Sequence, residues 1–178
     1  MKAVIPNIGS AQPEMHSTAK EHMMIMDAEV RTLIDRAAIS DIVNAYASAV
    51  DGRDWDRFRS LFFDSVFIDF RFFAPDLYRQ LSLDELVTIT QGLAAFDATQ
   101  HLSTNHVHTI DGDRARCVSY MHAGHFLTHE GEAHACFLYG HYTYELQRVG
   151  TGWKIDRYGL QVTAQHGDPR VFEWVGMR

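Results

Sequence analysis

Cysteine and proline are scarce in this chain of 178 residues, which contains only two cysteines and four prolines. Cys117 and Cys136 both lie in stretches that read as strands. The first 28 residues show no basic start followed by an unbroken apolar core, as a secretory signal would require. Two thiols without such a signal fit a reducing compartment better than a disulfide scaffold. We therefore expect core thiols and a cytoplasmic protein.

Positive charge and long apolar runs are also lacking. Sixteen basic residues against twenty-three acidic ones give a formal net charge of -7, which argues against nucleic acid or an anionic membrane as a partner. No apolar stretch approaches the length needed to cross a bilayer. A small neutral or cationic ligand fits this charge balance better. We expect a small hydrophobic molecule as substrate or ligand, and neither a nucleic-acid nor a membrane partner.

Apolar residues are abundant, at 46% of the chain with 12% aromatic, so one domain can bury a substantial core. We expect residues 1–28 to be a flexible N-terminal extension and residues 29–178 to form the domain. Apolar residues recur at three- and four-residue steps over 30–50, which predicts an amphipathic helix. Gly52 is a plausible stop. Asp54 is a candidate cap for a short second helix.

A capping box at Ser82-Leu83-Asp84-Glu85 predicts a third helix over 83–96. The remaining regular stretches alternate or are bounded by turn residues, which predicts strands at 66–73, 101–110, 114–128, 133–148 and 153–165. Helices grouped early against a later antiparallel sheet indicate an α+β layer fold. A strongly curved sheet of this kind can wrap the helices and enclose a pocket.

The most informative pair is Asp51, at the end of the first helical run, and His101, which opens a strand-like stretch. An imidazole oriented by a carboxylate can remove a proton near neutral pH. The alternative for Asp51 is a solvated helix-end carboxylate or a cap for the second helix. The helix dipole disfavours a carboxylate at a C-terminus, which supports another purpose. Tyr46 is either core or a hydrogen-bond donor to the pocket.

The loop at residues 111–113 decides which histidine shares a face with His101. A two-residue loop formed by the first two of these residues pairs His101 with His122. A three-residue loop pairs it with position 123 and brings His125 diagonally beside it. Asp-Gly suits either geometry, so the turn alone leaves both arrangements open.

Metal binding is the weaker hypothesis. His106 and His108 place two imidazoles on one face of a strand, but no acidic residue stands at recognisable ligand spacing, so we expect no metal site. Tyr142 lies in an alternating run that suits a pocket wall. Arg157 is two residues after Ile155, so regular alternation would point both side chains to the same face. An inward arginine would need an anionic partner, and would therefore form a buried ion pair or bind a substrate oxygen.

Several segments together resemble the SnoaL-like branch of the nuclear transport factor 2-like (NTF2-like) superfamily, and within it the scytalone dehydratases and their bacterial relatives. The resemblance covers about residues 30–175. It is carried by a fairly specific run over 46–57 and by shorter matches, which are Ile68-Asp69-Phe70-Arg71, Thr99-Gln100-His101, Gly124-His125 and Gly152-Trp153-Lys154. It implies a cone-shaped fold in which three N-terminal helices pack on a strongly curved, mixed or antiparallel sheet.

The resemblance also implies site residues. Asp51 and His101 match a catalytic dyad, and His125 matches a position that assists the leaving hydroxyl. Enzymes of this branch that eliminate hydrogen halide or dehydrate bile acids are similar through the same aspartate and histidine. Two tyrosines that polarise the substrate carbonyl in scytalone dehydratase are matched here by Val50 and Phe70. The residues left for that task are Tyr46, His122, Tyr142 and Arg157, and Tyr142 itself matches a substrate-binding asparagine.

These inferences predict a cofactor-free, dehydratase-like lyase that abstracts a proton next to a carbonyl of a small cyclic or aromatic-like substrate. One alternative is a SnoaL-type cyclase or isomerase acting on a polyketide or steroid-like ligand. Another is a non-catalytic ligand-binding or dimerisation module, since one fold hosts many functions. By resemblance we expect a homodimer or homotrimer that assembles through the outer face of the sheet.

Overall fold

The computed structural model describes residues 12–177, with side chains from residue 20 onward. The chain divides into two units after Asp35. Helix α1 spans Gln12–Asp51, so it begins well before the expected 30–50. Residues 12–28 of the expected N-terminal extension are helical, and residues 1–11 of that extension lie outside the described part. Within residues 12–177 no helix is long and apolar enough to cross a membrane.

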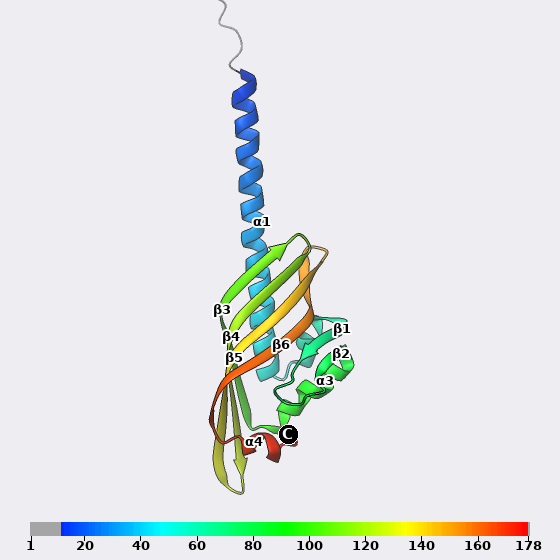
Figure 1. Ribbon diagram of the computed structural model, residues 1–178, viewed down its shortest axis with the longest axis vertical. Coiled ribbons are helices and arrows are strands. Elements are labelled where there is room, and N and C mark those ends of the chain that lie inside the picture. The colour runs from blue at the N-terminus through cyan, green and yellow to red at the C-terminus, as the bar shows by residue number, and fades with distance from the viewer. Residues whose placement is uncertain (1–11, 178) are drawn as a thin grey trace, which may run out of the picture. The chain divides into compact units, whose positions relative to one another are not determined.

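The part of α1 that belongs to the second unit buries one apolar stripe. Ile39, Val43, Tyr46 and Val50 are each at most 5% exposed and follow one another at steps of three or four residues, which is the spacing of one helix face. The sheet curves around this part of the helix (Figure 1). The amphipathic pattern therefore fixes which side of α1 meets the sheet.

The second unit contains one mixed sheet of six strands. The strands are β1 (Phe62–Asp69), β2 (Tyr78–Ser82), β3 (Ala98–Asp111), β4 (Arg114–His129), β5 (Glu132–Val149) and β6 (Gly152–Gly167). Their order in the sheet is β2-β1-β6-β5-β4-β3. All neighbours are antiparallel except β1 and β6, which are parallel. The four long strands match the predicted meander, and the unit has the expected α+β, NTF2-like cone architecture (Figure 1).

The second unit also contains short helices. Helix α2 (Trp55–Ser60) is capped by Asp54, whose side chain accepts a hydrogen bond from a backbone N–H as predicted. Helix α3 (Leu83–Gln91) begins with the predicted capping box and continues as the 3-10 turn η1 (Gly92–Ala95). Strand β2 and the C-terminal helix α4 (Arg170–Trp174) were not predicted, because five-residue elements carry too little periodicity to detect.

The β3–β4 hairpin has neither of the two loops considered from the sequence. Asp111 pairs with Arg114, so the loop is Gly112 and the residue after it, and Gly112 has a left-handed φ of 56°. This pairing alone would set His101 opposite Gly124.

A β-bulge corrects that register. The pairing shifts between Thr104 and Val107, where Asn105 has a left-handed φ of 56°. The extra residue on β3 moves His101 opposite Ala123 and therefore places it on the same face as His125. The outcome at His101 is the one that the three-residue loop predicts, but a bulge produces it.

A second irregularity changes which β6 side chains face inward. Leu146 pairs with Ile155, whereas Glu145 pairs with Arg157, so β6 carries one extra residue between these pairs. The alternation of inward-facing and outward-facing side chains along β6 reverses at this extra residue. Tyr158 is consequently buried, at 1% exposure, and Arg157 faces the other side of the sheet.

Candidate active site

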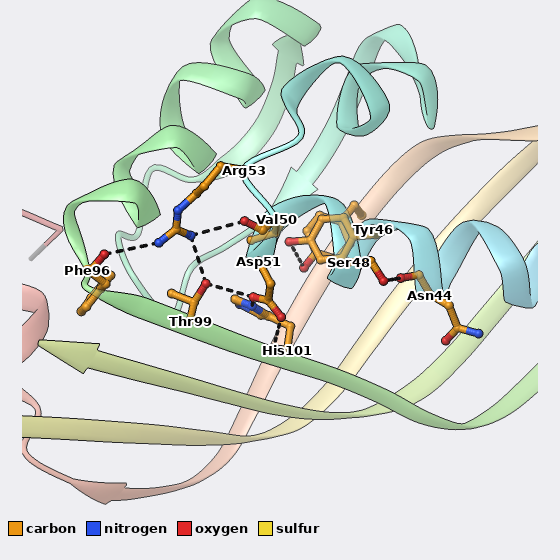
Figure 2. Close-up of polar contacts among 10 residues, drawn as sticks. Asn44, Tyr46, Ser48, Val50, Asp51, Arg53, Phe96, Thr99 and His101 are labelled. Carbon is orange, nitrogen blue, oxygen red and sulfur yellow. Dashed lines mark hydrogen bonds and ion pairs between the residues drawn. The ribbon is translucent and has the colours of Figure 1, made fainter.

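Asp51 and His101 are in direct contact (Figure 2). Asp51 Oδ1 lies 2.6 Å from His101 Nδ1, and Asp51 Oδ2 accepts the backbone N–H of His101 at 2.7 Å. The Thr99 hydroxyl donates to Asp51 Oδ1 at 2.9 Å. The carboxylate thus holds both the ring and the backbone of His101, which fixes the imidazole relative to the end of α1.

Arg53 supports this arrangement from the turn after α1. Its guanidinium donates to the Val50 carbonyl at 3.3 Å, to the Thr99 hydroxyl at 3.0 Å and to the Phe96 carbonyl at 3.3 Å (Figure 2). Arg53, and not the expected Gly52, takes the left-handed conformation at the helix end, with φ 57°. A left-handed arginine costs backbone energy. Its hydrogen bonds to Phe96 and Thr99 connect the end of α1 to the segment that follows η1 and to the start of β3.

The charge state of Asp51 follows from its partners. Burial raises the pKa of this carboxyl, but hydrogen bonds and attraction from His101 and the Thr99 hydrogen bond outweigh it, so the pKa lies below its ordinary value. An ionised Asp51 only accepts hydrogen bonds, so His101 Nδ1 carries the proton. In a neutral imidazole His101 Nε2 is then the bare nitrogen and the available base.

His101 borders a cavity of about 300 Å³ between the helices and the concave face of the sheet. His101 is 8% exposed and lies in its wall. Most of the lining is apolar and comes from the sheet, from the segment between β1 and β2, from α3 and η1, and from the residues after α4. Its apolar members include Phe70, Phe73, Leu77, Ile89, Leu93, Met121, Leu138, Leu160, Val175 and Met177. The volume is at the lower end of the range for small-molecule sites.

His125 lies in the same wall, with its ring centroid 5.7 Å from that of His101. It is 1% exposed and packs against Phe96 and Phe172. Burial, with a smaller contribution from His101, lowers the pKa of His125 to about 3. His125 is therefore neutral near pH 7. Its ring can still donate or accept a hydrogen bond, but it is not an imidazolium that could act as an acid.

Three tyrosines supply phenol hydroxyls to the cavity. Tyr158 Oη donates to Tyr46 Oη at 2.8 Å, and Tyr142 completes the group. Burial raises the pKa of all three phenols, so they stay protonated. Because Tyr46 accepts from Tyr158, its own proton is free to be donated elsewhere.

Three residues expected at the site lie elsewhere. Val50 is fully buried in the core and does not line the cavity. His122 pairs with Leu102 and stacks on Tyr139, on the face opposite to His101. Arg157 lies in a separate groove on the outer side of the sheet.

The partners of Arg157 explain its placement. Its guanidinium lies over the Phe67 ring at 4.1 Å and 3.9 Å from Glu145, so the β6 bulge gives it a partly exposed ion pair and not an inward role. Tyr158 was not predicted as a site residue, because the β6 bulge that turns it inward leaves no mark in the sequence. Arg53 was not predicted either, although its position directly after Asp51-Gly52 could have indicated it. The cavity-lining residues after α4 had no sequence signal that could have identified them.

Comparisons with known proteins agree with this architecture. The SnoaL-like domain model matches residues 31–159. No curated protein matches the chain significantly. Among solved structures, the Kfla4162 protein from Kribbella flavida is 28% identical, with 76% of this chain and 95% of that chain covered and a TM-score of 0.69.

Two more distant structures share the fold. A protein provisionally titled scytalone dehydratase from Novosphingobium aromaticivorans is 22% identical, with 79% of this chain and 91% of that chain covered and a TM-score of 0.69. A type 2 hexachlorocyclohexane dehydrochlorinase (LinA) is 19% identical, with 79% and 93% covered and a TM-score of 0.63. With a family model that matches most of its second unit, this chain belongs to the SnoaL-like domain family.

Proposed function

We propose that the protein is a cofactor-free lyase of the dehydratase type. The observation that carries the proposal is the contact of Asp51 with His101 Nδ1 and with the His101 backbone N–H, which in a neutral imidazole leaves Nε2 as the bare nitrogen of a ring in the wall of an apolar cavity. Membership of the SnoaL-like family supports it. So do the names of two structural neighbours, a dehydratase and a dehydrochlorinase, because both names describe elimination reactions.

In the proposed reaction His101 Nε2 removes a proton from the carbon next to a substrate carbonyl. The electron pair moves into the carbonyl, and the developing enolate oxygen accepts a hydrogen bond from Tyr46 or Tyr142, whose phenols remain protonated. Asp51 stays ionised and stabilises the imidazolium. The enolate then re-forms the carbonyl and a carbon–carbon double bond as the neighbouring hydroxyl leaves with the proton from His101, which yields water.

His125 has a more limited role in this scheme. Because its pKa lies near 3, it does not act as a charged acid, and the proton returned to the leaving group comes from His101. A neutral His125 ring can still hold the leaving hydroxyl by a hydrogen bond. One base that serves twice therefore accounts for both proton transfers.

The cavity limits the substrate class. Its apolar wall and volume of about 300 Å³ fit a small cyclic or aromatic-like carbonyl compound with few polar groups. A second candidate function, isomerisation, is favoured by the same finding about His125. A single mobile proton on His101 suffices to take a proton from one carbon and return it to another, with no leaving group at all.

The experiment is to incubate the protein with a panel of small cyclic β-hydroxy ketones in deuterium oxide. Proton NMR follows exchange next to the carbonyl, and mass spectrometry follows loss of water. Loss of water that depends on His101 supports the lyase. Exchange or double-bond migration without loss of water supports the isomerase. Saturable binding with neither exchange nor turnover refutes both and leaves a ligand-binding module.

A further inference from the structure

A second cluster of reactive side chains lies on the β3–β4 pair, apart from the cavity. His106 and His108 are on β3, and Cys117 on β4 is directly opposite His108. Each of the three side chains offers one ligand atom, and these atoms lie within 4.8 Å of one another. None of the three lines the cavity beside Asp51.

Ser40 on α1 joins the two imidazoles. Its hydroxyl lies 3.0 Å from His106 Nδ1 and 2.9 Å from His108 Nε2. A hydroxyl has one proton and two acceptor lone pairs, so Ser40 can donate to one ring and accept from the other, or accept from both. The contact orients both rings, and it occupies one nitrogen of each.

The other nitrogen of each ring has no partner. His106 Nε2 and His108 Nδ1 are both shielded from solvent and make no hydrogen bond with any residue in the described part of the chain. Buried nitrogens without partners are costly, and native proteins rarely leave two of them side by side. Cys117, which is 0% exposed, adds a third possible metal ligand, and its thiol does not require a hydrogen-bond partner.

We propose that His106, His108 and Cys117 form a binding site for a thiophilic transition-metal ion, with Zn²⁺ as the ion that fits this donor set. Two imidazoles and one thiolate are ligands that Zn²⁺ takes in tetrahedral sites, with bonds of about 2.0–2.3 Å. Ligand atoms within 4.8 Å of one another close to that geometry by rotation of the three side chains. A water molecule takes the fourth position.

Ser40 then has a defined role. With the ion on His106 Nε2 and His108 Nδ1, the nitrogens that face Ser40 both carry protons, and its oxygen accepts both hydrogen bonds. Outer contacts of this kind orient metal-bound histidines. Through Ser40 the ion would link α1 to both strands of the hairpin, and because none of its ligands lines the cavity, it takes no part in the chemistry at His101.

Two features moderate the affinity. Burial raises the pKa of the Cys117 thiol to about 11, so the ion must displace a proton when it binds. The positive charge of Arg36 acts on His108 and opposes a second cation. An Arg36→Gln variant should therefore bind Zn²⁺ several-fold more tightly than the wild type.

The test uses the full chain after treatment with a chelator. Calorimetry with zinc chloride should give one site per chain, and Co²⁺ should produce the intense near-ultraviolet band of a cobalt–thiolate bond. Cys117→Ser and His108→Gln should each weaken Zn²⁺ binding at least tenfold, and Cys117→Ser should abolish the cobalt band. Matched controls are Cys136→Ser and His141→Gln, which remove the same side-chain types outside the cluster and should leave both signals unchanged.

Circular dichroism checks that each variant is folded. If Cys117→Ser does not fold, alkylation of the wild type replaces it, because bound Zn²⁺ should slow modification of Cys117 and not that of Cys136. No cobalt–thiolate band in the wild type, or zinc binding that survives both Cys117→Ser and His108→Gln, overturns the proposal. These readouts need no substrate, so they stand or fall independently of the lyase activity.

Discussion

Replacing Asp51 with asparagine removes one charge while keeping the size of the side chain. In the wild type, Asp51 Oδ2 accepts the backbone N–H of His101, and Oδ1 accepts from His101 Nδ1 and the Thr99 hydroxyl. An asparagine has one oxygen and one NH₂ group to offer to these donors. The backbone N–H of His101 can only donate, so the side-chain oxygen of the introduced asparagine must accept that hydrogen bond.

The NH₂ group of the Asp51→Asn variant then faces the His101 ring. The ring can satisfy it only by presenting an unprotonated Nδ1, which moves the proton to Nε2 and points an N–H into the cavity. The base is lost although the side chains stay in place. An equivalent change of tautomer in a serine-protease triad lowers turnover about 10⁴-fold, so we expect a loss on the order of 10²–10⁴ with binding nearly unchanged.

The Asp51→Asn change should also lower the stability of the protein. Hydrogen bonds to a charged group contribute about 1.5–3 kcal/mol each and neutral ones about 1 kcal/mol, so the variant should lose roughly 1–3 kcal/mol in free energy of unfolding. The control is Asp54→Asn, the same chemical change three residues away at a helix N-cap, where the two residues are nearly equivalent.

Three measurements check the prediction. Nitrogen-15 NMR of the imidazoles reports the tautomer of His101, deuterium exchange into a bound ketone reports proton removal, and urea unfolding reports stability. An Asp51→Asn variant that keeps wild-type exchange, or that keeps the Nδ1–H tautomer while losing exchange, would refute the reasoning.

The remaining predictions concern the cavity, the pH dependence, the bulge and assembly. Tyr46→Phe removes a hydroxyl donor and should lower turnover on the order of 10²-fold without altering the shape of its pH profile, while unchanged turnover in steady-state kinetics would make Tyr46 a core residue only. Burial lowers the pKa of His125 from 6.5 to about 3, so its contribution to stability is complete above its unfolded pKa and is lost as the pH falls toward 3, by at most about 1.4 kcal/mol per pH unit. Urea unfolding at several pH values should show a flatter acid limb in His125→Phe, and equal slopes would contradict the assignment. Asn105→Gly should be tolerated at the left-handed bulge, whereas Asn105→Val should cost about 1–2 kcal/mol, and thermal unfolding of the two variants compares them. Leu102, Tyr120 and Tyr139 are exposed apolar residues of the outer sheet face, and light scattering should show a dimer or trimer that Tyr120→Lys weakens, while a monomeric wild type would refute assembly through this face.

The sequence determined the features that depend on neighbours along the chain. The spacing of Ile39, Val43, Tyr46 and Val50 specified the buried face of the first helix, because helix periodicity places such residues in one stripe. The capping box at Ser82 specified the start of α3, since its two hydrogen bonds are local. Alternation and turn residues likewise specified the four long strands.

Site residues were predictable where they sit at an element boundary. Asp51 at the end of an apolar helix and His101 at the start of a strand stood out by position, and the SnoaL-like resemblance added their partnership. Their 2.6 Å contact belongs to tertiary structure, because it joins residues fifty positions apart. The same holds for Arg53, whose acceptors lie on three separate segments.

Only the tertiary structure decided which side chains share a face. Two β-bulges, at residues 105–106 and before Arg157, insert one residue each and reverse the alternation beyond them. A period-2 pattern carries no mark of where such a reversal falls. The first bulge sets His125 beside His101, and the second exchanges Arg157 for Tyr158 in the cavity wall. The chain thus specified its elements locally, while the register of the sheet, a cooperative property of all its strands, selected the residues of the site.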